Sequence, residues 1–304
     1  MDLVQNTTDA AELARQAWDG FDFDLAWAVS WKNIPAIYQS TRPYPHEPSL
    51  QGLVDSELAK NFQHGEEHAL IGAAVLCGDM RHEREFFRDR YRAIRFHEVH
   101  GYDLSPKNLD AAGEALDFRF VPHKVDCNNL VMEKNKYHFI VGHHGIHHVY
   151  NVSNLFFQCN QGLKTGGLFY VEEYVGPRYL QTPFMNYWIS WLLLFLLFSK
   201  RERTTHEDRL KGKWMHYAPG MLDISEACNS EVIEKEMLDY FEPLHILRYG
   251  GLCYPMLEGL GRNFGAGKGM WRFRFIIYLE RALQHLKIIK PMFLQAILKK
   301  KEVW

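Results

Sequence analysis

Two apolar segments in the middle of the chain, Tyr137–Val141 and Gly167–Glu172, have the length and continuous hydrophobicity of buried β-strands. Between them, Val152–Leu163 carries apolar residues at helical spacing, and Lys164–Gly167 supplies residues that end a helix and form a turn. Strand, polar loop, helix and strand in this order predict a βαβ unit, whose crossover is expected to be right-handed.

The same alternation occurs earlier in the chain. The apolar and polar positions predict strands at Ala69–Cys77, Ile94–Tyr102 and Phe118–Val125, and helices at Glu83–Tyr91 and Ser105–Leu116. Ser105 is a suitable N-cap for the second helix, because Pro106 then occupies the first helical position. Together these elements predict an α/β fold with a mostly parallel sheet covered by helices on both faces.

The pattern is less regular on either side of this region. Residues 1–60 are expected to be mostly helical, with helices at Ala10–Trp18 and Trp27–Tyr38. After Pro177 we expect helices at Phe184–Lys200, Glu231–Tyr240, Glu258–Phe264, Tyr278–Lys287 and Met292–Lys299, and strands at Leu244–Tyr249 and Trp271–Leu279.

The composition argues against several classes of protein. The 304 residues include 35 basic and 37 acidic side chains, a formal net charge of -2, which argues against a general nucleic-acid-binding surface. The five cysteines are odd in number and form no CxxC pair, so neither a disulfide framework nor a cysteine zinc site is expected. The first residues lack the basic-then-apolar order of a signal peptide, and a cytoplasmic location is expected.

The loop after the strand at Tyr137–Val141 is rich in histidine. It contains His143, His144, His147 and His148, and in open α/β sheets ligands bind beyond the carboxyl ends of the strands. Imidazole is a good metal ligand. However, no adjacent carboxylate or cysteine set completes a metal motif and HExxH is absent, so we expect no metal site. The expected chemistry is proton transfer, since the pKa of histidine lies near neutral pH.

Two longer motifs resemble a known family. Residues 137–149 read YHFIVGHHGIHHV and residues 163–177 read LKTGGLFYVEEYVGP. They resemble the "YDLV…LHHI" and "LKPGGLF…EYVGP" segments of a bacterial branch of class I S-adenosylmethionine-dependent methyltransferases. The resemblance implies a Rossmann-like class I sheet in four parts: an N-terminal helical cap (1–60), a cofactor-binding core (61–177), a substrate lid or insert (178–243) and a C-terminal completion of the sheet with helices (244–304).

The resemblance also implies a site for S-adenosylmethionine, which becomes S-adenosylhomocysteine. The expected cofactor-binding residues follow successive strands: Cys77, Gly78, Asp79, Asp103, Leu104, Asp126, Cys127, Asn128, Gly142 and His143. Asp103 is expected to accept the ribose hydroxyls, and residues 126–128 to contact adenine. Leu76 and Met80 depart from the family pattern, because they stand where glycines are expected. A turn after Asp126 is the alternative interpretation of residues 126–128.

The implied reaction is methyl transfer to an oxygen or nitrogen atom of a small or medium metabolite, with sugar, natural-product and lipid-like acceptors all open. His144, His147 and His148 are the candidate bases, each with a structural role as the alternative. Glu173, Tyr174 and Trp188 are the candidate substrate contacts. The other functional hypothesis is a degenerate methyltransferase fold that binds without catalysis, which Leu76 and Met80 favour.

The segment Tyr187–Phe198 is apolar almost throughout and is followed by Lys200, Arg201 and Arg203. A membrane-spanning helix needs about 20 apolar residues, and this run is shorter. A buried or lid helix is one interpretation. The other is an interfacial helix that makes a weak membrane or lipid contact through residues 187–198.

Overall fold

The computed structural model describes residues 12, 15–16, 19, 50–62, 70–87, 95–115, 118–205, 210–211, 225–257, 260, 263–264 and 269–301. Most of the helix expected at Ala10–Trp18, and all of the one at Trp27–Tyr38, lie outside these residues. The division into four segments stays a prediction.

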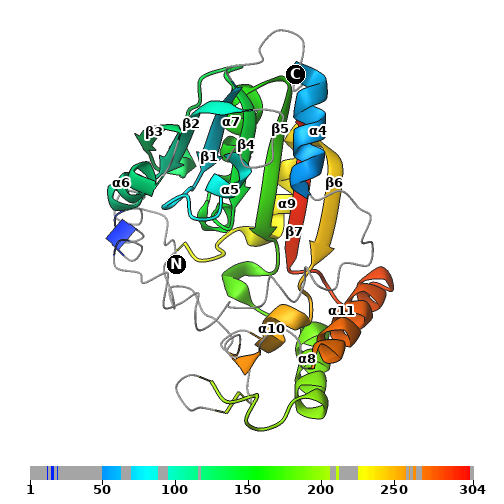
Figure 1. Ribbon diagram of the computed structural model, residues 1–304. Helices are drawn as coiled ribbons and strands as arrows, with labels where there is room; N and C mark the ends of the chain where they lie inside the picture. The colour runs from blue at the N-terminus through cyan, green and yellow to red at the C-terminus, as the bar shows by residue number, and fades with distance from the viewer. Residues whose placement is uncertain are drawn as a thin grey trace, which may run out of the picture.

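A seven-stranded sheet in the order β3-β2-β1-β4-β5-β7-β6 forms the centre of the structure (Figure 1). Strands β1 to β5 are parallel, and β7 is antiparallel to both of its neighbours, β5 and β6. The bounds are β1 Leu70–Val75, β2 Phe96–Asp103, β3 Arg119–Lys124, β4 Tyr137–His143, β5 Leu163–Tyr174, β6 Phe241–Tyr249 and β7 Phe293–Lys300. The predicted α/β, Rossmann-like fold class is confirmed.

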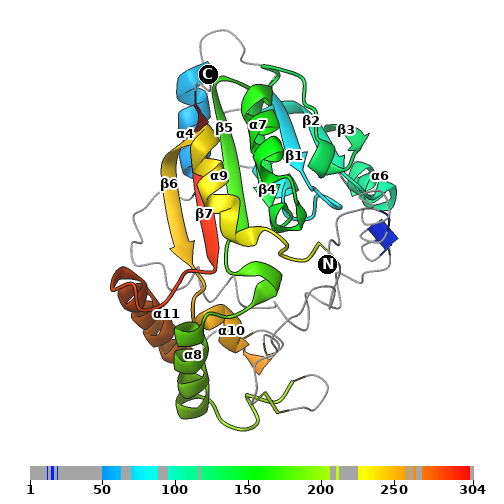
Figure 2. The ribbon, with the colours of Figure 1, turned by 180° about the vertical axis from the view of Figure 1, so that it is seen from behind.

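Helices cover both faces of the sheet, as Figures 1 and 2 show from opposite sides. On one face, α7 (Val152–Gly162) and α9 (Ile233–Tyr240) bury a cluster that includes Phe156 and Met237. On the other face, α4 (Leu50–Phe62), α5 (Arg84–Phe87) and α6 (Pro106–Ala115) bury Leu58 and Phe87. Strand β4 is buried at every position except His143, which explains its continuous apolar sequence.

Two sequence-based expectations near the C-terminal end are wrong. The segment expected to be a strand at Trp271–Leu279 lies in helix α11 (Met270–His285), which buries Phe273, Ile276, Ile277 and Glu280 at helical spacing. The helix expected at Met292–Lys299 is instead strand β7. Its sequence resembles a helical pattern because the sheet is covered on both faces. Leu294, Ala296, Ile297 and Leu298 are buried, whereas Gln295 is partly exposed.

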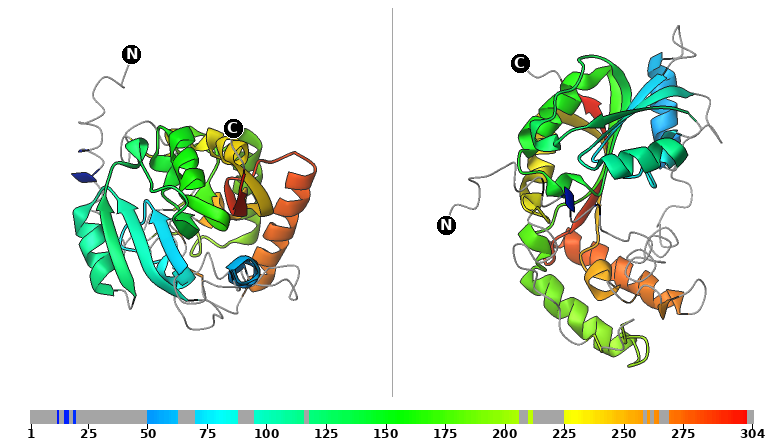
Figure 3. Two further views of the ribbon diagram at one scale, coloured as in Figure 1. Left: turned by 90° about the horizontal axis from the view of Figure 1, so that it is seen from above. Right: turned by 90° about the vertical axis from the view of Figure 1, so that its left-hand side faces the viewer.

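A third group of helices lies beyond the carboxyl ends of the parallel strands (Figure 1). Helices α8 (Phe184–Leu197), α10 (Cys253–Leu257) and α11 share one apolar cluster, in which Leu194, Met256 and Phe273 are buried. Figure 3 shows α8 and α11 extending away from the sheet. Helix α10 ends just before the helix expected at Glu258–Phe264, part of which lies outside the described residues. Within the described part of the chain, no helix is both long and apolar enough to cross a membrane.

Candidate active site

The turn after β1 holds three residues in the left-handed backbone region: Leu76 (φ 52), Gly78 (φ 49) and Met80 (φ 58). For a residue with a side chain this conformation costs on the order of 1–3 kcal/mol. Leu76 and Met80 therefore retain the backbone conformation that glycine favours at the two positions where the resemblance expects it. Met80 is completely buried, and its packing helps to offset the strain.

Asp103, at the end of β2, fixes this turn. Its Oδ2 accepts a hydrogen bond from the backbone N–H of Gly78 at 2.8 Å, and its Oδ1 accepts one from Ser105 at 2.9 Å. Burial raises the pKa of Asp103, while these backbone donors oppose the increase. A carboxylate has about four lone-pair positions, so Asp103 retains acceptor capacity for a ribose hydroxyl beside its backbone donors. Asp103 therefore fits the role that the resemblance implies.

The carboxyl end of β3 forms a turn. Asp126 Oδ1 accepts hydrogen bonds from the backbone and side-chain nitrogens of Asn128, and caps the short helix η3 (Cys127–Asn129). Asn128 Oδ1 accepts backbone hydrogen bonds from Tyr150 at 2.8 Å and Asn151 at 3.1 Å, which joins η3 to the start of α7. This is the turn alternative that the sequence left open, and the adenine contact stays a prediction.

Leu76 also touches the histidine-containing loop. A Cβ atom placed on Gly145 would lie 2.6 Å from Leu76 Cβ and 3.1 Å from its carbonyl oxygen, so only glycine fits there. The turn after β1 and the loop after β4 are therefore packed together where the family resemblance places the methionyl part of the cofactor.

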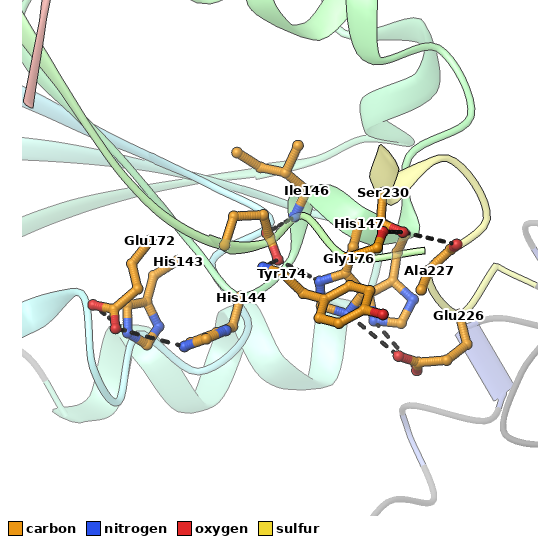
Figure 4. A network of polar contacts seen from close by, with 12 residues as sticks. His143, His144, Ile146, His147, Glu172, Tyr174, Gly176, Glu226, Ala227 and Ser230 are labelled. Carbon is orange, nitrogen blue, oxygen red and sulfur yellow. Dashed lines mark hydrogen bonds and ion pairs between the residues drawn. The ribbon is translucent and has the colours of Figure 1, made fainter. Parts of the chain in front are cut away.

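Glu173 organises the loop after β4, in which His144, Ile146 and His147 are labelled in Figure 4. Its carboxylate is fully buried and accepts hydrogen bonds from the backbone N–H of Ile146 at 2.6 Å and of Tyr174 at 2.6 Å. Its Oε1 lies 2.5 Å from His147 Nδ1. Burial alone would raise the pKa of Glu173, but the His147 imidazole outweighs it and lowers the pKa to about 2.

His147 carries a positive charge in this arrangement. Burial alone would lower its pKa, but the carboxylates of Glu173 and Glu226 raise it to about 10. An imidazole that is already protonated at neutral pH is poorly suited to accept a proton from a substrate. His147, in the short helix η4 (Ile146–His148), is therefore better suited to hold the loop than to act as a base.

Glu226 faces both imidazoles of η4. Its Oε1 lies 3.5 Å from His147 Nε2, and its Oε2 lies 3.8 Å from His148 Nε2. The other ring nitrogen of His148, Nδ1, lies 3.1 Å from Ser225 Oγ. Burial raises the pKa of Glu226, but the two imidazoles outweigh it and lower the pKa.

His143 points to another part of the site. Its Nδ1 lies 3.8 Å from Glu83, and its ring lies against His82 with centroids 5.1 Å apart. Burial lowers the pKa of His143 to about 3 and raises that of Glu83 to about 8. At neutral pH this pair is uncharged, because the histidine has lost its proton and the carboxyl group has kept its own.

His144 is the most exposed of the four histidines. Its side chain is 35% exposed, against 15% or less for the others. It has a φ of 52, its N–H donates to the Glu172 carbonyl at 2.8 Å, and its Nε2 lies 3.9 Å from Glu172 Oε1. Glu172 is held in place by hydroxyl donors from Tyr170 at 2.6 Å and Tyr249 at 2.7 Å.

The structure brings most of the predicted site residues to one edge of the sheet. Tyr174 is buried, and its hydroxyl donates to the Pro177 carbonyl at 2.8 Å. Trp188 lies on α8, outside this group, with 48% of its surface exposed. The contacts predicted for Glu173, Tyr174 and Trp188 with an acceptor stay predictions.

Sequence reasoning missed the roles of four other residues, namely Glu83, Glu172, Ser225 and Glu226. The signal that could have found Ser225 and Glu226 is the segment DISEA at residues 223–227, which resembles a motif of the same methyltransferase branch. Their pairing with η4 depends on the tertiary fold.

Residues 75–171 match the family model described as "Methyltransferase domain". The match lies within the region that the sequence assigns to the cofactor-binding core. It confirms the class I S-adenosylmethionine-dependent methyltransferase domain expected from the motifs, and with it the enzyme class and the cofactor. No curated protein matches this chain.

Solved structures with a similar arrangement have low sequence identity. A geranyl diphosphate C-methyltransferase from Streptomyces coelicolor A3(2) is 14% identical over 98% of this chain and 100% of its own, with a TM-score of 0.45. An S-adenosylmethionine-dependent methyltransferase from Mesorhizobium loti is 16% identical over 80% of this chain and 96% of its own, with a TM-score of 0.39. Values this low carry no information about the acceptor.

Proposed function

Because residues 75–171 form a methyltransferase domain, we propose that this protein transfers the methyl group of S-adenosylmethionine to an oxygen or nitrogen atom of a small or medium acceptor. The observation that carries the proposal is the hydrogen bond between Asp103 and Gly78, which joins the turn after β1 to the end of β2. Asp103 would accept the ribose hydroxyls, and Gly142 and His143 would lie against the methionyl part. When bound, the cofactor supplies the electrophilic methyl group.

His144 is the residue we propose as the base that removes the acceptor's proton. Among the four histidines of the loop, it combines the greatest exposure with a backbone fixed on β5. The His143 side chain is only 15% exposed and its pKa is strongly lowered, and His147 is held as a cation by Glu173. We therefore propose different roles for these residues, with His144 reaching the acceptor and His147 positioning the loop.

The outer face of α8 supports a lipid-like acceptor over a sugar. Its exposed residues are large and apolar: Phe184, Met185, Trp188, Leu192, Phe195 and Leu196. Trp271, Phe275 and Tyr278 are exposed on α11, which shares an apolar cluster with α8. An exposed apolar face of this kind marks an interaction site.

The charges around this face suit an anionic lipid surface. Lys200, Arg201 and Arg274 are exposed. In the described segments 184–204 and 269–290, the acidic residues are Glu202, which pairs with Arg272, and Glu280, which is buried. Within these two described segments, aromatic and aliphatic residues lie beside basic ones without an exposed acid, a pattern typical of helices that lie on membranes. We therefore propose that α8 and α11 contact a membrane surface from which the acceptor is drawn.

A methyltransferase fold that binds without catalysis is the second candidate. The side chain of Leu76, packed against Gly145, favours it because the leucine occupies space that a glycine would leave free. Calorimetric titration with S-adenosylhomocysteine separates the two. Micromolar binding supports the methyltransferase, whereas no heat at millimolar ligand would favour the binding protein.

A further inference from the structure

The side chains of His147, His148 and Glu226 converge. One ligand atom from each can be chosen so that all three lie within 4.8 Å of one another. The separations between Glu226 oxygens and the two Nε2 atoms, 3.5 and 3.8 Å, are longer than a normal hydrogen bond. Two atoms bound to one tetrahedral ion at about 2.0–2.1 Å lie about 3.3–3.4 Å apart. The distance from each imidazole to the nearer Glu226 oxygen is therefore close to the separation of two ligands of one ion.

The surroundings of the two imidazoles strengthen this interpretation. In metal sites, the ring nitrogen that does not bind the ion is usually hydrogen-bonded to an oxygen atom, which sets the tautomer and the ring orientation. Here His147 Nδ1 faces the buried carboxylate of Glu173, and His148 Nδ1 faces the hydroxyl of Ser225. In both rings Nδ1 is thus engaged, and both Nε2 atoms are directed toward Glu226.

A second group of similar composition, His143, His144 and Glu172, is less suitable. Both oxygens of Glu172 already accept tyrosine hydroxyls, from Tyr170 and Tyr249. Among the described hydrogen bonds, no hydroxyl group competes with an ion for the Glu226 carboxylate in this way.

We propose that His147 Nε2, His148 Nε2 and a Glu226 carboxylate oxygen bind one divalent transition-metal ion of the zinc type. Two imidazoles and one carboxylate are a ligand set that suits zinc, cobalt or iron better than magnesium or calcium. The ion takes the place of the proton on His147 Nε2, and that proton passes to the solvent. Three protein ligands leave a coordination position for water or for an oxygen atom of an acceptor. The proposal does not require methyl transfer to occur.

The test uses the full-length protein after treatment with a chelator, followed by titration with Zn²⁺ in a calorimeter and with Co²⁺ in a visible-absorption spectrometer. We expect one equivalent to bind and Co²⁺ to give visible absorption bands. Glu226→Gln is expected to weaken binding at least 10-fold, and Glu172→Gln, in the second group, to leave the affinity unchanged.

Three results would overturn the proposal. The first is that no Zn²⁺ binds at millimolar concentration. The second is that the wild type and Glu226→Gln bind Zn²⁺ with equal affinity. The third is that only Glu172→Gln loses affinity, which would place the ion at His143, His144 and Glu172 instead. Thermal melting of each variant shows whether it is folded, and His148→Gln provides a second substitution at the same site. S-adenosylhomocysteine binding is measured separately, so failure of the metal site is distinguishable from failure of the methyltransferase assignment.

Discussion

Glu173 Oε1 lies 2.5 Å from His147 Nδ1, in a place where the Glu173 side chain has no contact with solvent. The same carboxylate accepts the backbone N–H groups of Ile146 and Tyr174. One buried anion therefore fixes the end of β5, the start of η4 and the orientation of an imidazole. Removing its charge leaves the imidazolium of His147 without its closest partner.

We accordingly expect Glu173→Gln to lower the free energy of unfolding by about 3–5 kcal/mol, the cost of breaking a buried ion pair. Urea unfolding followed by circular dichroism measures this. The control is Glu231→Gln, which removes an exposed pair with Arg178 and should cost less than about 1 kcal/mol. Equal effects of the two substitutions would contradict the assigned role of Glu173.

Substitution of Asp103 should weaken cofactor binding. Hydrogen bonds to a charged group contribute about 1.5–3 kcal/mol, so Asp103→Ala is expected to reduce the affinity for S-adenosylhomocysteine by about 10- to 150-fold. Calorimetry measures the change. Asp110→Asn, on the exposed side of α6, serves as the control and should bind as the wild type does. An unchanged affinity in Asp103→Ala would show that the cofactor does not bind at the end of β2.

Glu83 should make stability depend on pH. Burial raises its pKa from 4.5 to about 8, so the folded protein holds the proton more tightly than the unfolded chain does. Its contribution to stability is complete below pH 4.5 and decreases by about 1.4 kcal/mol for each pH unit up to about 8.

Glu83→Gln removes this dependence, so the variant should gain more stability relative to the wild type at pH 8 than at pH 5.5. Urea unfolding at the two pH values measures the difference. Glu85→Gln, an exposed neighbour on α5, should show no such change. If the free energies of unfolding of Glu83→Gln and the wild type differ by the same amount at both pH values, Glu83 is not protonated in the folded protein.

The exposed face of α8 predicts binding to lipid vesicles. The wild type should sediment with vesicles that contain anionic lipid more strongly than with zwitterionic vesicles, and added salt should weaken the binding. The double variant Leu192→Glu, Leu196→Glu should bind at least 10-fold less, since burying each leucine contributes about 1.5–3 kcal/mol.

The matched control carries the same added charge elsewhere, as Val131→Glu with Leu244→Glu, both at exposed positions. If both double variants sediment as the wild type does, α8 does not contact the membrane. If both lose binding equally, the effect comes from net charge rather than from this face.

The central strands could be predicted from the sequence because burial on both faces leaves them continuously apolar, as in Tyr137–Val141. The same property misled the prediction at β7, where Leu294, Ala296, Ile297 and Leu298 are buried on the two faces of the sheet and resemble part of a buried helix. In the site, Asp103 and the four histidines could be predicted because they follow the ends of predicted strands. The partners of those residues could not be predicted in this way, because Glu226 reaches η4 only through the packing of the segment before α9.

The position of β7 has a consequence for synthesis of the protein. β6 pairs only with β7 in this sheet, and β7 separates it from β5, so β6 has no strand partner until residues 293–300 are available. Tyr249, at the end of β6, donates to Glu172 in the site. A ribosome-bound chain that lacks β7 would thus expose the edges of both β5 and β6, which are prone to aggregate. Folding of the active site is therefore expected to be completed only after residue 300 has left the ribosome.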